Sequence, residues 1–306
     1  MSRNNETVKK SKRLQDLTMK DNFMFGAVMS EPENCKRFLE MVLGISIDYV
    51  EIDVERSMIY NPEYKGIRLD VYAKDEHKTH YNVEMQAQRE TELGRRSRYY
   101  HSQIAMELLA RGQGYEKMSD SYVIFVCDFD PFALKKYCYT FESICIETKE
   151  AELKDGRKTI ILSTRGENED EVPEEMVKFL KFIKSDVSTC MKDFEDEFVA
   201  RLQKSMQKIK TDREMEGRYM RLELLLYDER RKAKAEGRAE GKAEGKAEGK
   251  AEERAIAIID ILEERWEVPE ILKERILKET DIDVLHGWFR QAIKAESVEE
   301  FITQMD

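Results

Sequence analysis

The sequence predicts an α/β protein, with a mixed β-sheet flanked by helices, then a long helix and a small all-α C-terminal unit. Two observations lead to this prediction. Alternating and β-branched apolar runs between residues 50 and 163 are interspersed with helical segments, an order that indicates a mixed sheet. Beyond Gly166 the strand patterns stop, and apolar residues recur at steps of three and four, as in amphipathic helices.

The first structured segment, residues 14–43, has the apolar spacing of two short helices. The dipeptide Glu31-Pro32 interrupts it, because proline is tolerated at a helix start but not inside a helix. Gly44 is a plausible stop for the second helix.

The next segment has the pattern of a sheet. Residues 50–59 alternate apolar and polar side chains, and residues 67–73 and 79–86 flank a polar turn at 74–78, as in a hairpin. The run YVIFVC is almost continuously apolar, which is typical of a strand covered on both faces. The elements expected after the hairpin are a helix over 87–115 and strands at 122–127, within 137–146 and at 159–163.

The C-terminal half is expected to be helical. Residues 176–183 and 194–231 have helical spacing, and residues 254–306 contain several short apolar helices with little core of their own. Between them, residues 234–253 repeat the unit Lys/Arg-Ala-Glu-Gly. Its glycines and its like charges at i,i+4 are unfavourable in a helix, so a helix that pairs with a partner and a flexible spacer both remain open.

The composition excludes some classes of protein. The net charge of −11 argues against a basic protein that coats DNA, although residues 167–197 alone contribute −7 and the N-terminal region is basic. No apolar run is long enough for a membrane span, and the N-terminus lacks the apolar segment of a secretion signal. Five cysteines without a CxxC pair indicate reduced thiols, and we expect a cytoplasmic protein.

The hairpin has the most informative polar residues. If its turn centres on His77, then Asp70 and Glu84 lie directly opposite each other, and Gln86 shares the face of Glu84. Opposed like charges destabilise a sheet, and a divalent cation explains their presence. Hard cations such as Mg²⁺ bind one or two carboxylates together with substrate phosphates. Acids are common in this chain, however, and chance alone gives such a spacing easily.

Three motifs together resemble a known family. They are KDNFMFGAVM (Lys20–Met29), the spacing D-x13-E-x-Q from Asp70 to Gln86, and RRSRYYHSQ (Arg95–Gln103). In these the chain resembles the Rpn family of recombination-promoting nucleases, also called putative transposases, in the PD-(D/E)XK nuclease superfamily. The resemblance covers residues 14 to about 185.

The resemblance implies a PD-(D/E)XK-type sheet and Mg²⁺-dependent cleavage of DNA, with Mn²⁺ as an alternative cation. Asp70 and Glu84 would bind the metal, with the backbone carbonyl of Met85 as a further ligand. Gln86 occupies the usual lysine position and supplies no positive charge. Leu69 stands where the motif name has proline.

Other residues are candidates for supporting roles. Asp21 is a further acid from the first helix, although capping that helix explains it equally well. Arg95, Arg96 and Arg98 form a phosphate patch, since arginine binds phosphate bidentately; a solvated charged face is the alternative. The remaining DNA-binding candidates, which would line the DNA groove unless a tyrosine is simply buried, are Tyr99, Tyr100 and Gln103.

These observations lead to one leading hypothesis, a metal-dependent DNA endonuclease linked to recombination or transposition. One alternative is an inactive, DNA-associated assembly protein that acts through its helical C-terminal region, and another is an interaction module based on the repeat. DNA and a second copy of the chain are the expected partners. The expected domains are a basic arm (1–13), a nuclease-like domain (14–190), a long amphipathic helix (191–233), the repeat (234–253) and a helical C-terminal unit (254–306).

Overall fold

The computed structural model of the chain describes residues 12–58, 67–109 and 113–305. Two compact units are present, Met1–Arg221 and Leu222–Asp306. Most of the predicted basic arm lies outside the described residues.

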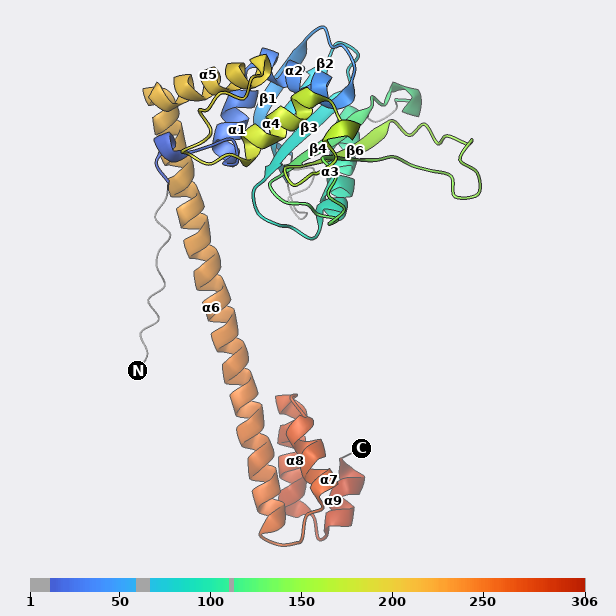
Figure 1. The fold of residues 1–306 in the computed structure, drawn as a ribbon. Helices are drawn as coiled ribbons and strands as arrows, with labels where there is room; N and C mark the ends of the chain where they lie inside the picture. The colour runs from blue at the N-terminus through green and yellow to red at the C-terminus, as the bar shows by residue number, and fades with distance from the viewer. Residues whose placement is uncertain (1–11, 59–66, 110–112, 306) are drawn as a thin grey trace. The chain divides into compact units, whose positions relative to one another are not determined.

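The N-terminal unit contains a six-stranded mixed sheet with the order β1-β2-β3-β4-β6-β5 (Figure 1). The pairs β3–β4 and β4–β6 are parallel, and the other pairs are antiparallel. This confirms the predicted α/β fold class with a mixed sheet. The strands are β1 (Val50–Met58), β2 (Ile67–Asp75), β3 (His80–Gln86), β4 (Ser121–Cys127), β5 (Cys138–Phe141) and β6 (Arg157–Ser163).

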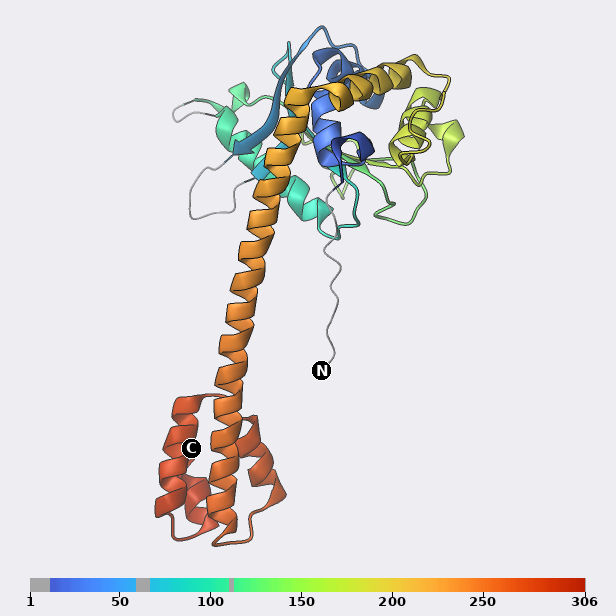
Figure 2. The ribbon, with the colours of Figure 1, turned by 90° about the vertical axis from the view of Figure 1, so that its left-hand side faces the viewer.

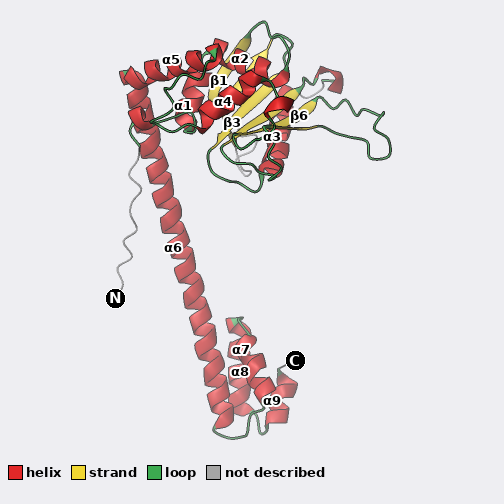
Figure 3. Ribbon diagram, viewed as in Figure 1, coloured by secondary structure: helices red, strands yellow, loops and turns green. Residues whose placement is uncertain are grey.

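Helices cover both faces of the sheet, with the strands between them (Figure 3). On one face, α1, α2, α4 and α5 share the larger apolar core with the sheet. On the other face, α3 packs on β4 through a smaller core that includes Tyr100, Ile104 and Phe125. The helices of this unit are α1 (Asn22–Met29), α2 (Pro32–Leu43), α3 (Leu93–Leu108), α4 (Glu174–Lys184) and α5 (Glu197–Thr211), with short 3-10 turns at Leu14–Asp16, Tyr115–Lys117 and Glu169–Glu171.

The boundaries of the first helices follow from two residues. Pro32 lies at the start of α2, where a backbone N–H has no helical partner to lose. Gly44 ends α2 in the left-handed region with φ +67°, a conformation that costs glycine little. Both predicted boundaries are therefore confirmed.

The β2–β3 hairpin has the predicted register. Val71 pairs with Val83 and Lys74 with His80, so the turn centres on residue 77. Asp75 stabilises this turn, because its carboxylate accepts hydrogen bonds from the backbone N–H of His77 at 2.9 Å and of Thr79 at 2.8 Å. Continued by one residue, this register places Asp70 opposite Glu84.

Two helices differ from the prediction. Helix α3 begins at Leu93 rather than at residue 87, because β3 runs to Gln86 and an irregular segment follows it. It ends at Leu108 rather than at residue 115, because the backbone of Leu109 is extended. The segment 194–231, predicted as one helix, is divided at Asp212 between α5 and α6 (Arg213–Glu263). Asp212 has an extended backbone with ψ 120°, and its carboxylate accepts a hydrogen bond from the N–H of Glu214 at 2.8 Å. This capping interaction starts a new helix.

The C-terminal unit consists of the later part of α6 and three short helices, α7 (Glu270–Lys278), α8 (Ile282–Lys294) and α9 (Val298–Gln304), which lie beside the end of α6 (Figure 2). The repeat 234–253 is helical throughout. Ala251 and Ala255 in α6 share an apolar core with Trp288 in α8 and Phe301 in α9. The predicted helical character of residues 254–306 is confirmed, and their core includes the last part of the repeat.

A search of the described residues for membrane-spanning helices found no candidate of sufficient length and apolar character.

Candidate active site

Each of the two opposed carboxylates accepts a hydrogen bond from the backbone of the neighbouring strand. The amide N–H of Asp70 donates a hydrogen bond to Glu84 Oε1 at 3.3 Å. The amide N–H of Met85 in turn donates to Asp70 Oδ2 at 3.1 Å. The register and these bonds hold both carboxylates on the α3 side of the sheet, so the two positions face each other as expected from the sequence.

Burial makes the charge on Glu84 costly. Its side chain is 3% exposed, whereas Asp70 is half-buried. Burial first, and then the negative charge of Asp70, raise the pKa of Glu84 to about 8, although Arg96 acts in the opposite direction. Glu84 therefore binds a proton readily unless a further positive charge is present.

Arg96 of α3 contacts Glu84 and Gln86 and provides one positive charge. Its Nη2 contacts Glu84 Oε2 at 3.3 Å, and its Nη1 donates a hydrogen bond to Gln86 Oε1 at 2.9 Å. Glu90 and the Tyr100 hydroxyl hold the same guanidinium, at 2.5 Å and 2.8 Å. Gln86 has no charge of its own, so Arg96 places a cation beside the position where the superfamily motif has lysine.

The other residues of α3 that were predicted to contact DNA lie on different faces of this helix. Tyr100 lies one turn after Arg96, is buried, and its hydroxyl is 3.5 Å from Glu84 Oε2. Arg95 and Arg98 are exposed, and Arg95 forms an ion pair with Glu92 at 3.2 Å. Gln103 is half-buried further along α3, as is Tyr99.

Helix α1 reaches the site through a residue that the sequence analysis did not single out. Asn22 Nδ2 donates a hydrogen bond to Asp70 Oδ2 at 3.2 Å. Asp21, the predicted further acid, lies at the N-cap position of α1, and its carboxylate accepts hydrogen bonds from the Thr18 N–H at 2.8 Å and from Lys12 Nζ at 2.7 Å. In the sequence, Asn22 is marked by its position next to Asp21 in the motif KDNFMFGAVM. A metal-binding role for Asp21 remains a prediction.

The residues present fit a divalent cation held by two protein carboxylates. Glu84 and Asp70 offer hard oxygen donors, and their mutual repulsion in a buried position favours a bound cation. Asn82, fully buried two residues before Glu84, acts on the same carboxyl, because its amide lowers the pKa of Glu84. Within the described ranges no group of three or more His, Cys, Asp or Glu side chains that could hold a metal ion is found. The Met85 carbonyl remains a predicted ligand.

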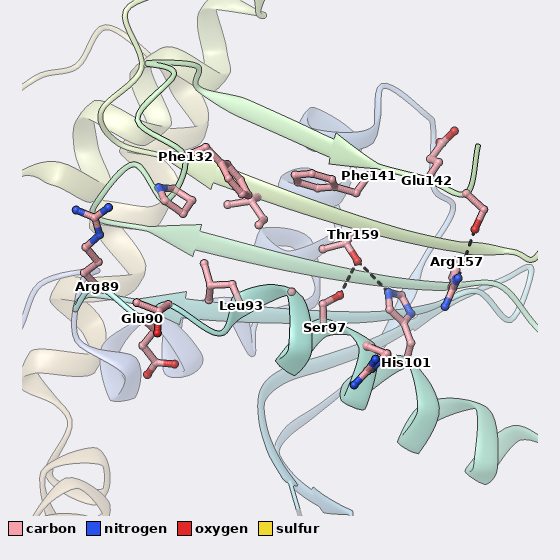
Figure 4. Close-up of a pocket in the computed structure, with 16 residues that line it drawn as sticks. Arg89, Glu90, Leu93, Ser97, His101, Phe132, Phe141, Glu142, Arg157 and Thr159 are labelled. Atoms are coloured by element: carbon pink, nitrogen blue, oxygen red, sulfur yellow. Dashed lines mark hydrogen bonds between the residues drawn. The ribbon is translucent and has the colours of Figure 1, made fainter. Parts of the chain in front are cut away.

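A pocket of about 500 Å³ lies on the same side of the sheet, between α3, β5 and β6 (Figure 4). Thr159 on β6 links it to α3 through contacts of 2.5 Å with Ser97 and 3.2 Å with His101. Burial lowers the pKa of His101 to about 4, so this imidazole is neutral at physiological pH. The pocket joins residues distant in sequence, and no sequence pattern indicated it.

Comparison with known protein families identifies the class of protein to which this fold belongs. The sequence profile of the PD-(D/E)XK nuclease family transposases matches residues 13–240, three quarters of the chain. The chain belongs to this family, and its mixed sheet flanked by helices is the PD-(D/E)XK fold. Searches of curated proteins and of solved structures returned no match. Membership in the family supports nuclease activity and binding to DNA.

Proposed function

We propose that the protein is a metal-dependent DNA endonuclease that hydrolyses phosphodiester bonds in recombination or transposition. The observation that supports this most strongly is the pair Asp70 and Glu84, opposed on adjacent strands, with the pKa of Glu84 raised by burial and by its neighbour. Such a pair of like charges destabilises a sheet, and its presence therefore indicates a functional site.

Asp70 and Glu84 would hold Mg²⁺, with Mn²⁺ as an alternative, and the Met85 carbonyl would be a further ligand. When bound, the cation would lower the pKa of a water and offset charge on the phosphate. The hydrogen bonds of the protein orient the two carboxylates. Asn22 and the Met85 N–H fix one Asp70 oxygen, and the Asp70 N–H fixes one Glu84 oxygen.

Gln86 and Arg96 would act together on the phosphate. Arg96 holds the amide oxygen of Gln86, which leaves the amide nitrogen to donate to a water or a phosphate oxygen. The guanidinium itself provides the positive charge that glutamine lacks. Arg95 and Arg98, exposed on α3, would contact the DNA backbone on either side, and Gln103 would extend this surface.

The wider biology is part of the same proposal. We propose a cytoplasmic protein that forms homo-oligomers through its helical C-terminal region. Oligomerisation would raise the affinity of an acidic chain for DNA, because linked sites bind more tightly than single ones.

A plasmid-nicking assay tests the proposal. Purified protein is incubated with supercoiled plasmid and Mg²⁺ or Mn²⁺, next to Asp70→Ala and Glu84→Ala. A matched control is Glu51→Gln, which removes an exposed carboxylate from β1 of the same sheet. Wild type and the control should nick the plasmid, and the two site variants should not. Nicking that survives both substitutions would refute the assigned site, and failure of every form to nick would favour an inactive, DNA-associated assembly protein.

A further inference from the structure

The pocket beside the carboxylates is large enough for a ligand and has no role in the proposed hydrolysis. Its volume of about 500 Å³ lies in the range of roughly 300–1,000 Å³ that is usual for small-molecule sites. Leu93 and Ile161, both buried, line its interior.

One side of the pocket is aromatic. The side chains of Phe132 and Phe141 are 41% and 46% exposed, and their ring centroids are 5.4 Å apart. Figure 4 shows both rings across the pocket from Ser97 and His101. Partly exposed aromatic rings at a pocket wall favour a ligand with an aromatic group of its own.

The charges at the pocket favour an anion. Arg89 and Arg98 line it and are exposed, and neither guanidinium forms an ion pair with any residue that the structure describes. Arg157, the third arginine of the lining, is already paired with Asp155 at 2.6 Å. Two arginines therefore remain for a phosphate, which arginine binds bidentately.

The acids of the lining do not cancel this charge, because each has a cationic partner. Glu90 pairs with Arg96 at 2.5 Å, and Glu142 pairs with Lys158 at 2.5 Å. An aromatic wall together with unpaired cations matches a nucleotide, which has an aromatic base and a phosphate.

The pocket is also close to the proposed site of cleavage. Across the sheet, Glu84 on β3 pairs with Phe125 on β4, and Phe125 pairs with Ile161 on β6. Two strand spacings of about 4.8 Å place Ile161 roughly 10 Å from Glu84 on the same face. This equals about three stacked nucleotides at roughly 3.4 Å each.

We propose that this pocket binds an unpaired nucleotide of the DNA substrate near the phosphate that is cleaved. The base stacks against Phe132 and Phe141, and Arg89 and Arg98 hold its phosphate. A paired base cannot enter, because its faces are covered by its neighbours in the duplex. The inference rests on the proposed function and adds a preference for DNA with unpaired bases.

Binding measurements test the pocket separately from catalysis. Fluorescence anisotropy with the full-length protein in EDTA compares a dye-labelled duplex with the same duplex carrying a short unpaired bubble. The variants are Phe132→Ala and Arg98→Gln. The matched control is Leu134→Ala, which truncates a 66% exposed side chain two residues from Phe132 and outside the pocket. Circular dichroism confirms that each variant is folded.

Wild type and Leu134→Ala should bind the bubble at least 10-fold more tightly than the duplex. Phe132→Ala should weaken bubble binding by about 5-fold or more, toward the affinity of the duplex, and leave duplex binding nearly unchanged. Arg98→Gln should weaken both and reduce the salt dependence.

Three results would overturn the proposal: equal binding of the two DNAs by wild type, an unchanged preference in Phe132→Ala, or no binding of either DNA. Deoxyadenosine monophosphate that binds as tightly as the bubble would assign the pocket to a free nucleotide, which also overturns it. Cleavage without a preference for the bubble leaves the proposed function intact. Conversely, a bubble preference without nicking by wild type contradicts the endonuclease alone.

Discussion

Replacing the buried glutamate by its neutral isostere should change how stability depends on pH. In the wild-type protein the pKa of Glu84 is raised from 4.5 to about 8, mainly by burial. The folded protein therefore binds more protons than the unfolded chain between these values. The contribution of Glu84 to the free energy of unfolding is fully present below pH 4.5 and is lost as the pH rises to 8.

The size of this loss follows from the shift. About 1.4 kcal/mol accompanies each unit of pKa difference, so at most about 5 kcal/mol is lost between pH 4.5 and pH 8. Glu84→Gln removes this contribution, because the amide does not titrate. Between pH 5 and pH 8.5, the metal-free wild type should lose up to about 4 kcal/mol more stability than the variant.

Urea titrations in EDTA at pH 5 and pH 8.5 measure the difference. Tyrosine near-UV circular dichroism is the suitable signal, because both tryptophans, Trp266 and Trp288, lie in the C-terminal unit. The matched control is Glu90→Gln, which removes an exposed carboxylate bound to the same Arg96 and should follow wild type. Parallel pH dependence in wild type and Glu84→Gln would refute the reasoning.

Three further predictions follow from other parts of the chain. Arg96→Gln should raise the pKa of Glu84 further, because it removes the neighbouring positive charge. The midpoint of the pH–rate profile for nicking should therefore move to higher pH, and an unmoved midpoint would count against this contact. Trp288→Ala should cost the C-terminal unit about 3–5 kcal/mol, read from the unfolding midpoint of Trp266 fluorescence, whereas an unchanged midpoint would show that this core is not cooperative. Deleting residues 234–253 should lower the number of chains per particle, as calculated from the mass that light scattering gives. An unchanged number of chains would place oligomerisation elsewhere.

The hairpin was the part of the site most accessible from sequence. Its register depends on local alternation and on a polar turn, so counting from His77 was enough to place Asp70 opposite Glu84. Gln86 followed from the side-chain period of two. The metal itself, and the role of each residue, remain predictions.

The helix over the site was predicted less well, because its contacts depend on packing. Arg95, Arg96 and Arg98 were treated as one patch, although of these three Arg96 alone contacts Glu84 and Gln86. Arg96, Tyr100 and Ile104 follow one another in steps of four and so share one face of α3. This spacing could have separated Arg96 from Arg95 and Arg98.

Two further features of the fold could not be taken from the sequence with certainty. The break at Asp212 interrupts a helical pattern that continues on both sides, so only capping by its carboxylate marks it. Conversely, the glycines of the repeat 234–253 argued equally for a linker, yet α6 continues through them. Helical propensity is a weak guide there, because each glycine disfavours a helix by only about 1 kcal/mol relative to alanine.

The central claim is that Asp70 and Glu84 together hold one divalent cation. Titration of metal-free protein with Mn²⁺, followed by electron paramagnetic resonance of the free ion, measures this directly. Wild type at pH 8.5 should bind one Mn²⁺ per chain, Asp70→Asn and Glu84→Gln should each lose that binding, and lowering the pH to 5 should weaken it in wild type because a proton competes for Glu84. Equal Mn²⁺ binding by wild type and both variants would contradict the claim.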